Sequence, residues 1–160
     1  MLKQRVYVET TIASYLAARP TRDLIAAARQ ELTHEWWQTR RQDFDLFILQ
    51  VAINEATQGD PDAAVRRLMY LDGLPLVDII VEVEAVAAAL LQSGAMPPRA
   101  TNDAFHLAAA GVHGLDYLLT WNFRHLANAE LTATYRDIFF SRGFEPPIIC
   151  TPEELMGEVQ

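Results

Sequence analysis

The sequence predicts an α/β protein, a three-layer α/β/α sandwich with a central, mostly parallel sheet. Two observations support this fold class. Short apolar runs alternate along the chain with longer segments of helical composition, and glycine or proline stands at many of the boundaries between them. Strands that alternate with helices pair in parallel, and the helices cover both faces of the sheet.

The first half of the chain contains two predicted strands and three clear predicted helices. In order, these are a strand at 5–9, helices at 10–19 and 21–41, a strand at 44–50 and a helix at 61–73. Pro20 ends the first helix, and Thr21 is the expected N-cap of the second. The second strand leads into a segment that Gly59 closes. The helix after it has Pro61 inside its start and Gly73 past its end, the usual positions of these residues.

The second half repeats the pattern. In order, we expect a strand at 74–80, helices at 81–94 and 97–114, a strand at 116–120, a helix at 132–143, and a short edge strand with a tail at 146–155. Gly94 caps the first of these helices, and Gly111 or Gly114 caps the second. The sequence shows no internal repeat and no flexible linker.

Composition indicates one globular domain, residues 1–160, with its core at about 4–150. A chain of 160 residues that is 51% hydrophobic can bury one substantial core. The basic N-terminus lacks the apolar run of an export signal, and no stretch approaches the roughly 20 apolar residues of a membrane span. Cys150 is the single cysteine, so an internal disulfide is impossible. We therefore expect a cytoplasmic protein without a membrane partner.

The net charge of −8 repels nucleic acid. A polyanionic substrate would therefore need local basic patches or a metal ion. Arginine doublets occur at 40–41 and 66–67, and solvated helix faces are their simplest interpretation. Trp36 and Trp37 could stack on RNA bases, although packing in the core or in a dimer is the simpler role.

Four oxygen-bearing side chains fall near the ends of predicted core elements. In an open parallel sheet, ligands bind beyond the carboxyl ends of the strands. Glu9 directly follows V-Y-V, Glu55 lies in the helix after the second strand, Asp103 lies early in the helix before the fourth strand, and Asn122 follows that strand. A half-buried carboxylate such as Glu9 must be paired or must bind a metal. Each acid also has a simpler role: Glu9 as a helix N-cap, Glu55 as a solvent-facing side chain and Asp103 as a cap.

Their joint placement indicates a metal site. Three converging carboxylates repel one another unless a divalent cation neutralises them, and oxygen ligands favour Mg²⁺ or Mn²⁺ over zinc. Such a site performs metal-assisted phosphoryl chemistry. We therefore predict that Glu9, Glu55, Asp103 and Asn122 are both catalytic and metal-binding.

Four segments resemble the motifs of PIN-domain ribonucleases, specifically the VapC-type toxins of bacterial toxin–antitoxin pairs. These segments are VYVETTIASYL, INEA, TNDAFHLA and YLLTWNFRHLAN, which occur in the right order over roughly residues 4–150. The resemblance implies an α/β/α sandwich, a Mg²⁺- or Mn²⁺-dependent acidic site and endonucleolytic cleavage of RNA. It also implies a homodimer and a small cognate antitoxin that blocks the site.

The chain departs from this family pattern at three points. Glu9 stands where the family usually has aspartate, Asn122 replaces the fourth acid, and FILQVAINE lacks the serine often found ahead of the second acid. The lost charge favours one firmly bound ion over two. Restoring it by Asn122→Asp should strengthen metal binding. If Asn122 instead donates its amide hydrogens to a carboxylate such as Glu9, the substitution should weaken binding or destabilise the metal-free protein.

Several neighbours could support the carboxylates or contact the substrate. Arg124 and His125 follow Asn122, where they would face a groove that holds RNA phosphates, although His125 could equally be a surface histidine. His106 shares a helical face with Asp103 and could orient it or contact substrate, while a satisfied core histidine is the simpler interpretation. Thr10 and Thr120 adjoin the proposed site.

Other classes with clustered acids fit less well. A phosphoreceiver domain needs a lysine after a late strand, and Lys3 is the only lysine in the chain. A haloacid-dehalogenase-type phosphatase needs two aspartates that flank one residue at the first strand end, and VETTI has neither. The serious alternative is a catalytically weak or inactive PIN-like protein that serves as an interaction module.

Overall fold

The computed structural model describes residues 2–157 and has a parallel sheet at its centre. Within this part of the chain, four strands pair in the order β2-β1-β3-β4. They are β1 (Gln4–Val8), β2 (Phe44–Phe47), β3 (Tyr117–Leu119) and β4 (Ile148–Cys150). Every pairing is parallel, with Val6 of β1 opposite Leu46 on one side and Tyr117 on the other.

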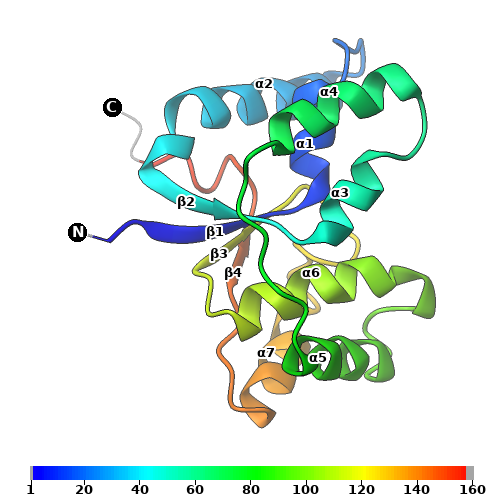
Figure 1. Cartoon of the computed structure of the whole chain (residues 1–160), viewed down its shortest axis with the longest axis vertical. Helices are drawn as coiled ribbons and strands as arrows, with labels where there is room; N and C mark the ends of the chain where they lie inside the picture. The colour runs from blue at the N-terminus through cyan, green and yellow to red at the C-terminus, as the bar shows by residue number, and fades with distance from the viewer. Residues whose placement is uncertain (1, 158–160) are drawn as a thin grey trace.

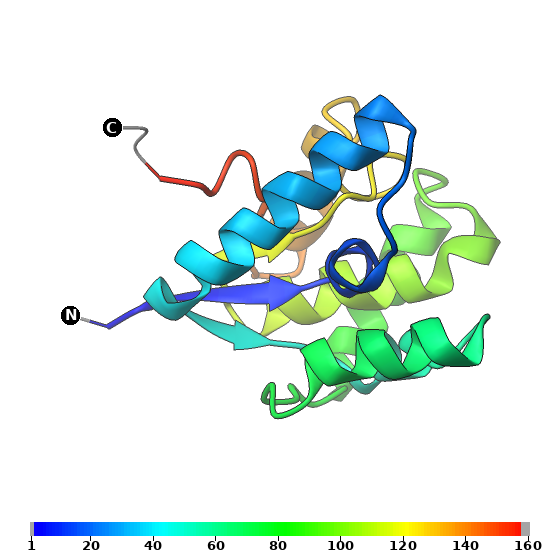
Figure 2. The same ribbon diagram turned by 90° about the horizontal axis from the view of Figure 1, so that it is seen from above.

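Helices cover both faces of this sheet, which confirms the α/β/α fold class (Figure 1). One layer contains α1 (Thr10–Ala17), α2 (Leu24–Thr39) and α4 (Pro61–Leu71), with α3 (Gln50–Ala56) between the sheet and α4. The other layer contains α5 (Val81–Gln92), α6 (Thr101–Val112) and α7 (Thr132–Ser141). Short 3₁₀ turns, Arg41–Asp43 and Pro98–Ala100, precede β2 and α6. Viewed from above, β1 and β2 point the same way, so their carboxyl ends lie together (Figure 2).

Alternation along the strands divides the core into two halves. Val6 and Val8 of β1 pack with α1 and α2, whereas Tyr7 between them packs with α5, α6 and α7. In β3, Leu118 and Leu119 divide in the same way. Successive side chains of a strand point to opposite faces, so an apolar run without alternation is what a sheet buried on both faces requires.

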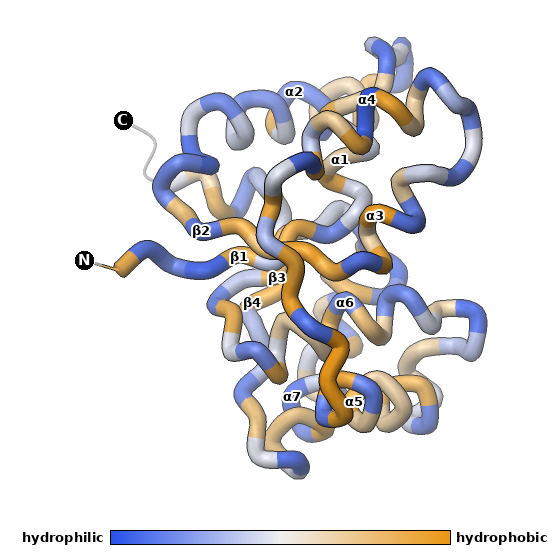
Figure 3. The backbone as a smooth tube through the Cα atoms, viewed as in Figure 1, coloured by the Kyte–Doolittle hydropathy of each residue, from blue (hydrophilic) through white to orange (hydrophobic). Residues whose placement is uncertain are grey.

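The expected strand at 74–80 is wrong. This segment is an extended connection that crosses from α4 to α5, and only Leu76 forms a bridge, to Ile48. Its apolar composition, visible as the orange stretch in Figure 3, suggested a buried strand. Pro75 has no N–H to donate, and Leu76, Ile79 and Ile80 are 49%, 41% and 39% exposed. The segment therefore covers the end of the sheet without joining it.

Two helix boundaries also differ from the prediction. The N-cap of α2 is Asp23, whose carboxylate accepts a hydrogen bond from the Ala26 N–H at 2.7 Å, and not Thr21. The helix expected at 97–114 is divided into a 3₁₀ turn and α6. Each helix of residues 2–157 is too short or too polar to span a lipid bilayer.

Candidate metal centre

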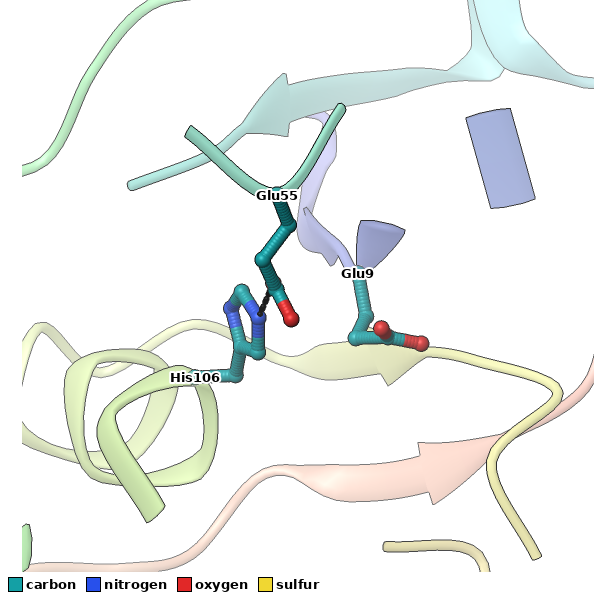
Figure 4. Close-up of side chains that lie close together, drawn as sticks. All are labelled: Glu9, Glu55 and His106. Atoms are coloured by element: carbon teal, nitrogen blue, oxygen red, sulfur yellow. Dashed lines mark hydrogen bonds and ion pairs between the residues drawn. The ribbon is translucent and has the colours of Figure 1, made fainter. Parts of the chain in front are cut away.

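Three side chains from three elements meet at the carboxyl end of the sheet. Glu9 lies between β1 and α1, Glu55 lies in the last turn of α3, and His106 lies in the middle of α6. One potential ligand atom from each lies within 4.8 Å of the others. Figure 4 shows the Glu55 carboxylate and the His106 ring pointing toward each other, with Glu9 beside them. The topology therefore brings two of the predicted acids, Glu9 and Glu55, together.

Glu9 is buried, with 3% of its surface exposed, and it is the N-cap of α1. Its Oε2 accepts a hydrogen bond from the Thr11 N–H at 3.1 Å, as the capping interpretation expects. Its Oε1 accepts from the Thr11 hydroxyl at 2.5 Å and from the Thr120 hydroxyl at 2.6 Å. These donors hold the carboxyl group in one orientation. Capping and metal binding are compatible, because a carboxylate oxygen has more than one lone pair.

Glu55 is held through a single oxygen. Its Oε1 accepts hydrogen bonds from the Thr10 hydroxyl at 2.7 Å and from His106 Nε2 at 2.6 Å. Two donors on one oxygen also fix the direction of the other oxygen, Oε2. The side chain is 28% exposed, so this carboxylate connects the buried cluster to solvent.

His106 is fully buried and forms part of a chain of hydrogen bonds. Its Nδ1 meets the Tyr7 hydroxyl, and that hydroxyl accepts a hydrogen bond from the Leu49 N–H at 3.3 Å. Nε2 must carry a hydrogen in either protonation state, because Glu55 Oε1 can only accept. Burial raises the pKa of Tyr7 well above its usual value, so the phenol keeps its proton. His106 is thus a satisfied core histidine, as the simpler interpretation expected, and it also orients Glu55.

Asp103 lies one turn before His106 and is half-buried. In residues 2–157, the close ligand group consists of Glu9, Glu55 and His106 and does not include Asp103. Its charge nevertheless raises the pKa of His106, and the pKa of Asp103 is in turn lowered by His106 and raised by Glu55. Asp103 therefore borders the cluster, and its place in a metal shell stays a prediction.

Asn122 follows β3 and faces Asp103. Its Oδ1 accepts a hydrogen bond from the His125 N–H at 3.0 Å, which closes a turn after the strand. Its side-chain amide is among the hydrogen-bonding groups that lower the pKa of Asp103. Asn122 therefore acts on Asp103, while the side chains that donate to Glu9 are Thr11 and Thr120.

The surroundings shift the pKa values of the titratable groups in different directions. Burial raises the pKa of Glu9, and the charge of His106 opposes this only in part. Burial likewise raises the pKa of Asp103. For Glu55, burial acts in the same direction, but the hydrogen bond and charge of His106 outweigh it and lower the pKa. Burial would lower the pKa of His106, yet Glu55 and the other carboxylates raise it. Glu9 and Asp103 therefore keep their protons to a higher pH than free carboxyl groups do, unless a further cation is present.

The remaining predicted residues support the carboxylates, follow Asn122 in the chain, or lie in the core. Thr10 and Thr120 donate directly to Glu55 and Glu9, as described above. Arg124 is exposed two residues after Asn122, and His125 is among the groups that lower the pKa of Asp103. Trp36 and Trp37 are in the core, at 0% and 9% exposure, so they do not offer surfaces for base stacking.

Sequence reasoning missed two supporting residues, Tyr7 and Thr11. Tyr7 lies in the middle of a buried strand, where its apolar neighbours make packing a sufficient explanation. Thr11 donates to both oxygens of Glu9 through its N–H and hydroxyl, and the doublet of threonines after Glu9 was the one available signal.

The donor set suits a hard or borderline divalent cation. Two carboxylates lie within reach of a common point, and hydrogen bonds already fix the orientation of each carboxyl group, while both ring nitrogens of His106 are occupied by Tyr7 and Glu55. Carboxylate oxygens of this kind are typical ligands of Mg²⁺ and Mn²⁺. The residues present therefore fit such an ion.

The sequence matches no family model and no curated protein. Among solved structures, the chain is similar to a chain in the crystal structure of VapBC2 from Rickettsia felis bound to a DNA fragment from their promoter. The TM-score is 0.57 at 13% identity, and the alignment covers 92% of this chain and 98% of that chain. At this identity the likeness is one of fold, and it agrees with a PIN-like α/β/α class.

Proposed function

We propose that this protein is a metal-dependent endoribonuclease of the VapC type. It would hydrolyse RNA phosphodiester bonds at a Mg²⁺ or Mn²⁺ site. One observation carries the proposal: Glu9 and Glu55 meet at the carboxyl end of a parallel sheet, with their orientations fixed by buried threonines and His106. A purely structural role would not require two carboxylates to converge where they repel each other.

The residues have distinct roles in this proposal. A bound divalent ion would supply Lewis-acid stabilisation of the phosphate and activation of water. Glu9 and Glu55 would hold the ion, and Asp103, with Asn122 beside it, would complete the acidic border of the site. Thr10, Thr120 and His106 would keep the carboxylates in position, so that little reorganisation accompanies the reaction.

The proposal also covers partners. The fold likeness to VapBC2 supports the resemblance in the sequence to VapC-type toxins. We therefore propose RNA as substrate, a small cognate antitoxin that blocks the site, a homodimeric assembly and a cytoplasmic location.

Thermal unfolding tests the metal site. Manganese that binds only the folded protein should raise Tm, since a hundredfold excess over Kd stabilises by about 2.7 kcal/mol. Glu55→Gln should remove most of this shift. Glu31→Gln, which makes the same charge change at an exposed position of α2, should leave it intact.

RNA cleavage tests the activity. The natural protein should cleave single-stranded RNA with manganese and not with chelator, and Glu55→Gln and Asp103→Asn should lose this activity. A protein whose Tm responds to manganese but which cleaves no RNA would be the inactive PIN-like interaction module. A protein with neither response would have no metal site.

A further inference from the structure

Two aromatic residues flank Asn122 at the edge of the proposed metal centre. Trp121 is buried at 6% exposure, whereas Phe123 is 42% exposed. Their rings are 6.1 Å apart in an edge-to-face arrangement. Part of the Phe123 ring is therefore open to a ligand.

Trp121 is held rigidly and is connected to the acidic cluster. Its backbone N–H donates to the Thr11 hydroxyl at 2.9 Å, and its indole N–H donates to the Thr33 hydroxyl at 2.8 Å. The same Thr11 hydroxyl donates to Glu9 Oε1. One threonine therefore links the aromatic pair to a proposed metal ligand, and the pair cannot lie far from the ion.

Arg29 of α2 covers this aromatic pair with a positive charge. Its guanidinium carbon lies 4.8 Å from the centre of the Phe123 ring and 5.6 Å from the centre of the Trp121 ring. Within residues 2–157, no carboxylate forms an ion pair with Arg29. Without an acidic partner, the Arg29 guanidinium remains available to an anion.

We propose that Phe123 and Arg29 form a subsite for one nucleotide of single-stranded RNA next to the cleaved bond. The Phe123 ring would stack on the base and Arg29 would contact its phosphate. This inference rests on the proposed ribonuclease function. Aromatic side chains stack on any base, and arginine adds both cation–π and phosphate contacts, so the pair suits single strands without strong sequence preference. The combination of ring, cation and adjacent acidic cluster favours a nucleotide over an apolar peptide.

Binding of a short fluorescein-labelled RNA, measured by anisotropy with chelator to prevent cleavage, tests the subsite. Phe123→Leu keeps an apolar side chain but removes the ring, and it should weaken binding by about tenfold. Phe123→Tyr restores the ring and should restore binding. Phe140→Leu is the matched control, because Phe140 is also exposed, at 55%, but lies on α7. An RNA with abasic sites should bind the natural protein weakly and should not distinguish Phe123→Leu from it.

The outcomes separate the two proposals. Equal binding by the natural protein and Phe123→Leu, in a protein that cleaves RNA, would overturn the subsite and leave the ribonuclease function standing. An equal loss of binding in Phe123→Leu and Phe123→Tyr would also overturn it, since the ring would then not be the cause. A natural protein that neither binds nor cleaves RNA would overturn both. The manganese-induced rise in Tm should be unchanged in all three variants, which shows that they fold and retain the metal site.

Discussion

Asn122 makes two interactions that no carboxylate could make together. Its oxygen accepts from the His125 N–H, and its amide group lowers the pKa of Asp103 through hydrogen bonding. An ionised aspartate can accept but cannot donate. The amide at this position therefore favours the charged form of Asp103.

Asn122→Asp should destabilise the metal-free protein. The substitution removes a donor from Asp103 and places a second negative charge beside it, so the free energy of unfolding should fall by about 1–3 kcal/mol. Manganese should relieve the repulsion, and the metal-induced rise in Tm should then exceed that of the natural protein. Calorimetric unfolding with and without manganese measures both effects. If neither quantity changes, Asn122 does not take part in the site.

Metal binding should strengthen as pH rises. The pKa values of Glu9 and Asp103 are raised in the folded protein, so folding favours their protonated forms. Their contribution to stability is present below the unfolded pKa and is lost as pH rises through the folded pKa. Protons compete with the ion at these residues, and the manganese-induced rise in Tm should grow as pH rises above the ordinary carboxyl range. Glu55, whose pKa is lowered, stays ionised there. A metal effect that does not vary with pH would contradict the assignment.

The sequence predicted the acidic residues of the site more completely than the contacts that orient them. Glu9 and Glu55 could be placed by one rule, because ligands collect beyond the carboxyl ends of parallel strands. The contacts that orient them join residues separated by 45, 51 and 99 positions: Thr10 to Glu55, His106 to Glu55, and Tyr7 to His106. Such contacts depend on side-chain directions across three elements, which no local pattern contains.

At the scale of elements, apolar runs located the four strands, since the central strands are buried by helices on both faces. The same reasoning misassigned 74–80, because composition cannot show whether a partner strand is free to pair. Pro75 limits the ladder there, and the neighbouring strand β2 ends at Phe47, so only Ile48 pairs with Leu76. A segment that has the composition of a strand but no neighbouring strand to pair with forms an extended connection instead.

Close packing between α6 and α7 depends on Gly111. A Cβ atom at this position would overlap the ring of Phe139. Phe139 is fully buried, so its ring has no space into which to move. The sequence suggested a helix cap at Gly111, but the residue lies inside α6 and serves helix–helix contact.

Gly111→Ala should therefore destabilise the protein. Overpacking a core costs about 1–3 kcal/mol, and the better helix propensity of alanine returns about 1 kcal/mol. We expect the free energy of unfolding to fall by up to about 2 kcal/mol in denaturant titrations. Adding Phe139→Leu should make the effect of Gly111→Ala smaller than in the natural background, because the smaller side chain leaves room for the methyl group. Equal effects in both backgrounds would show that the ring is not the obstacle.

At the scale of the whole molecule, many arginines serve the fold. Arg66 donates to the Ala17 carbonyl at 2.9 Å, and Arg67 donates to the Ala56 carbonyl at 3.0 Å, so this doublet binds the carboxyl ends of α1 and α3. Arg40 pairs with Asp43 at 3.4 Å, and Arg41 lies 4.2 Å from the centre of the Trp37 ring. The doublets are thus more than solvated helix faces, and they do not form a broad basic surface for RNA.

RNA affinity should consequently depend only weakly on salt. For single strands, the slope of log K against log salt concentration is about −0.7 for each phosphate neutralised. Arg29 and Arg124 are the exposed or half-exposed arginines beside the site, so two phosphate contacts give an expected slope of about −1.4.

Arg29→Gln should reduce this slope by about 0.7, whereas Arg136→Gln, on the exposed side of α7, should leave it unchanged. Fluorescence anisotropy over a salt series in chelator gives each slope. A slope steeper than about −3 would require more than four phosphate contacts, and RNA would then have to bind a second basic surface, such as one completed by another subunit.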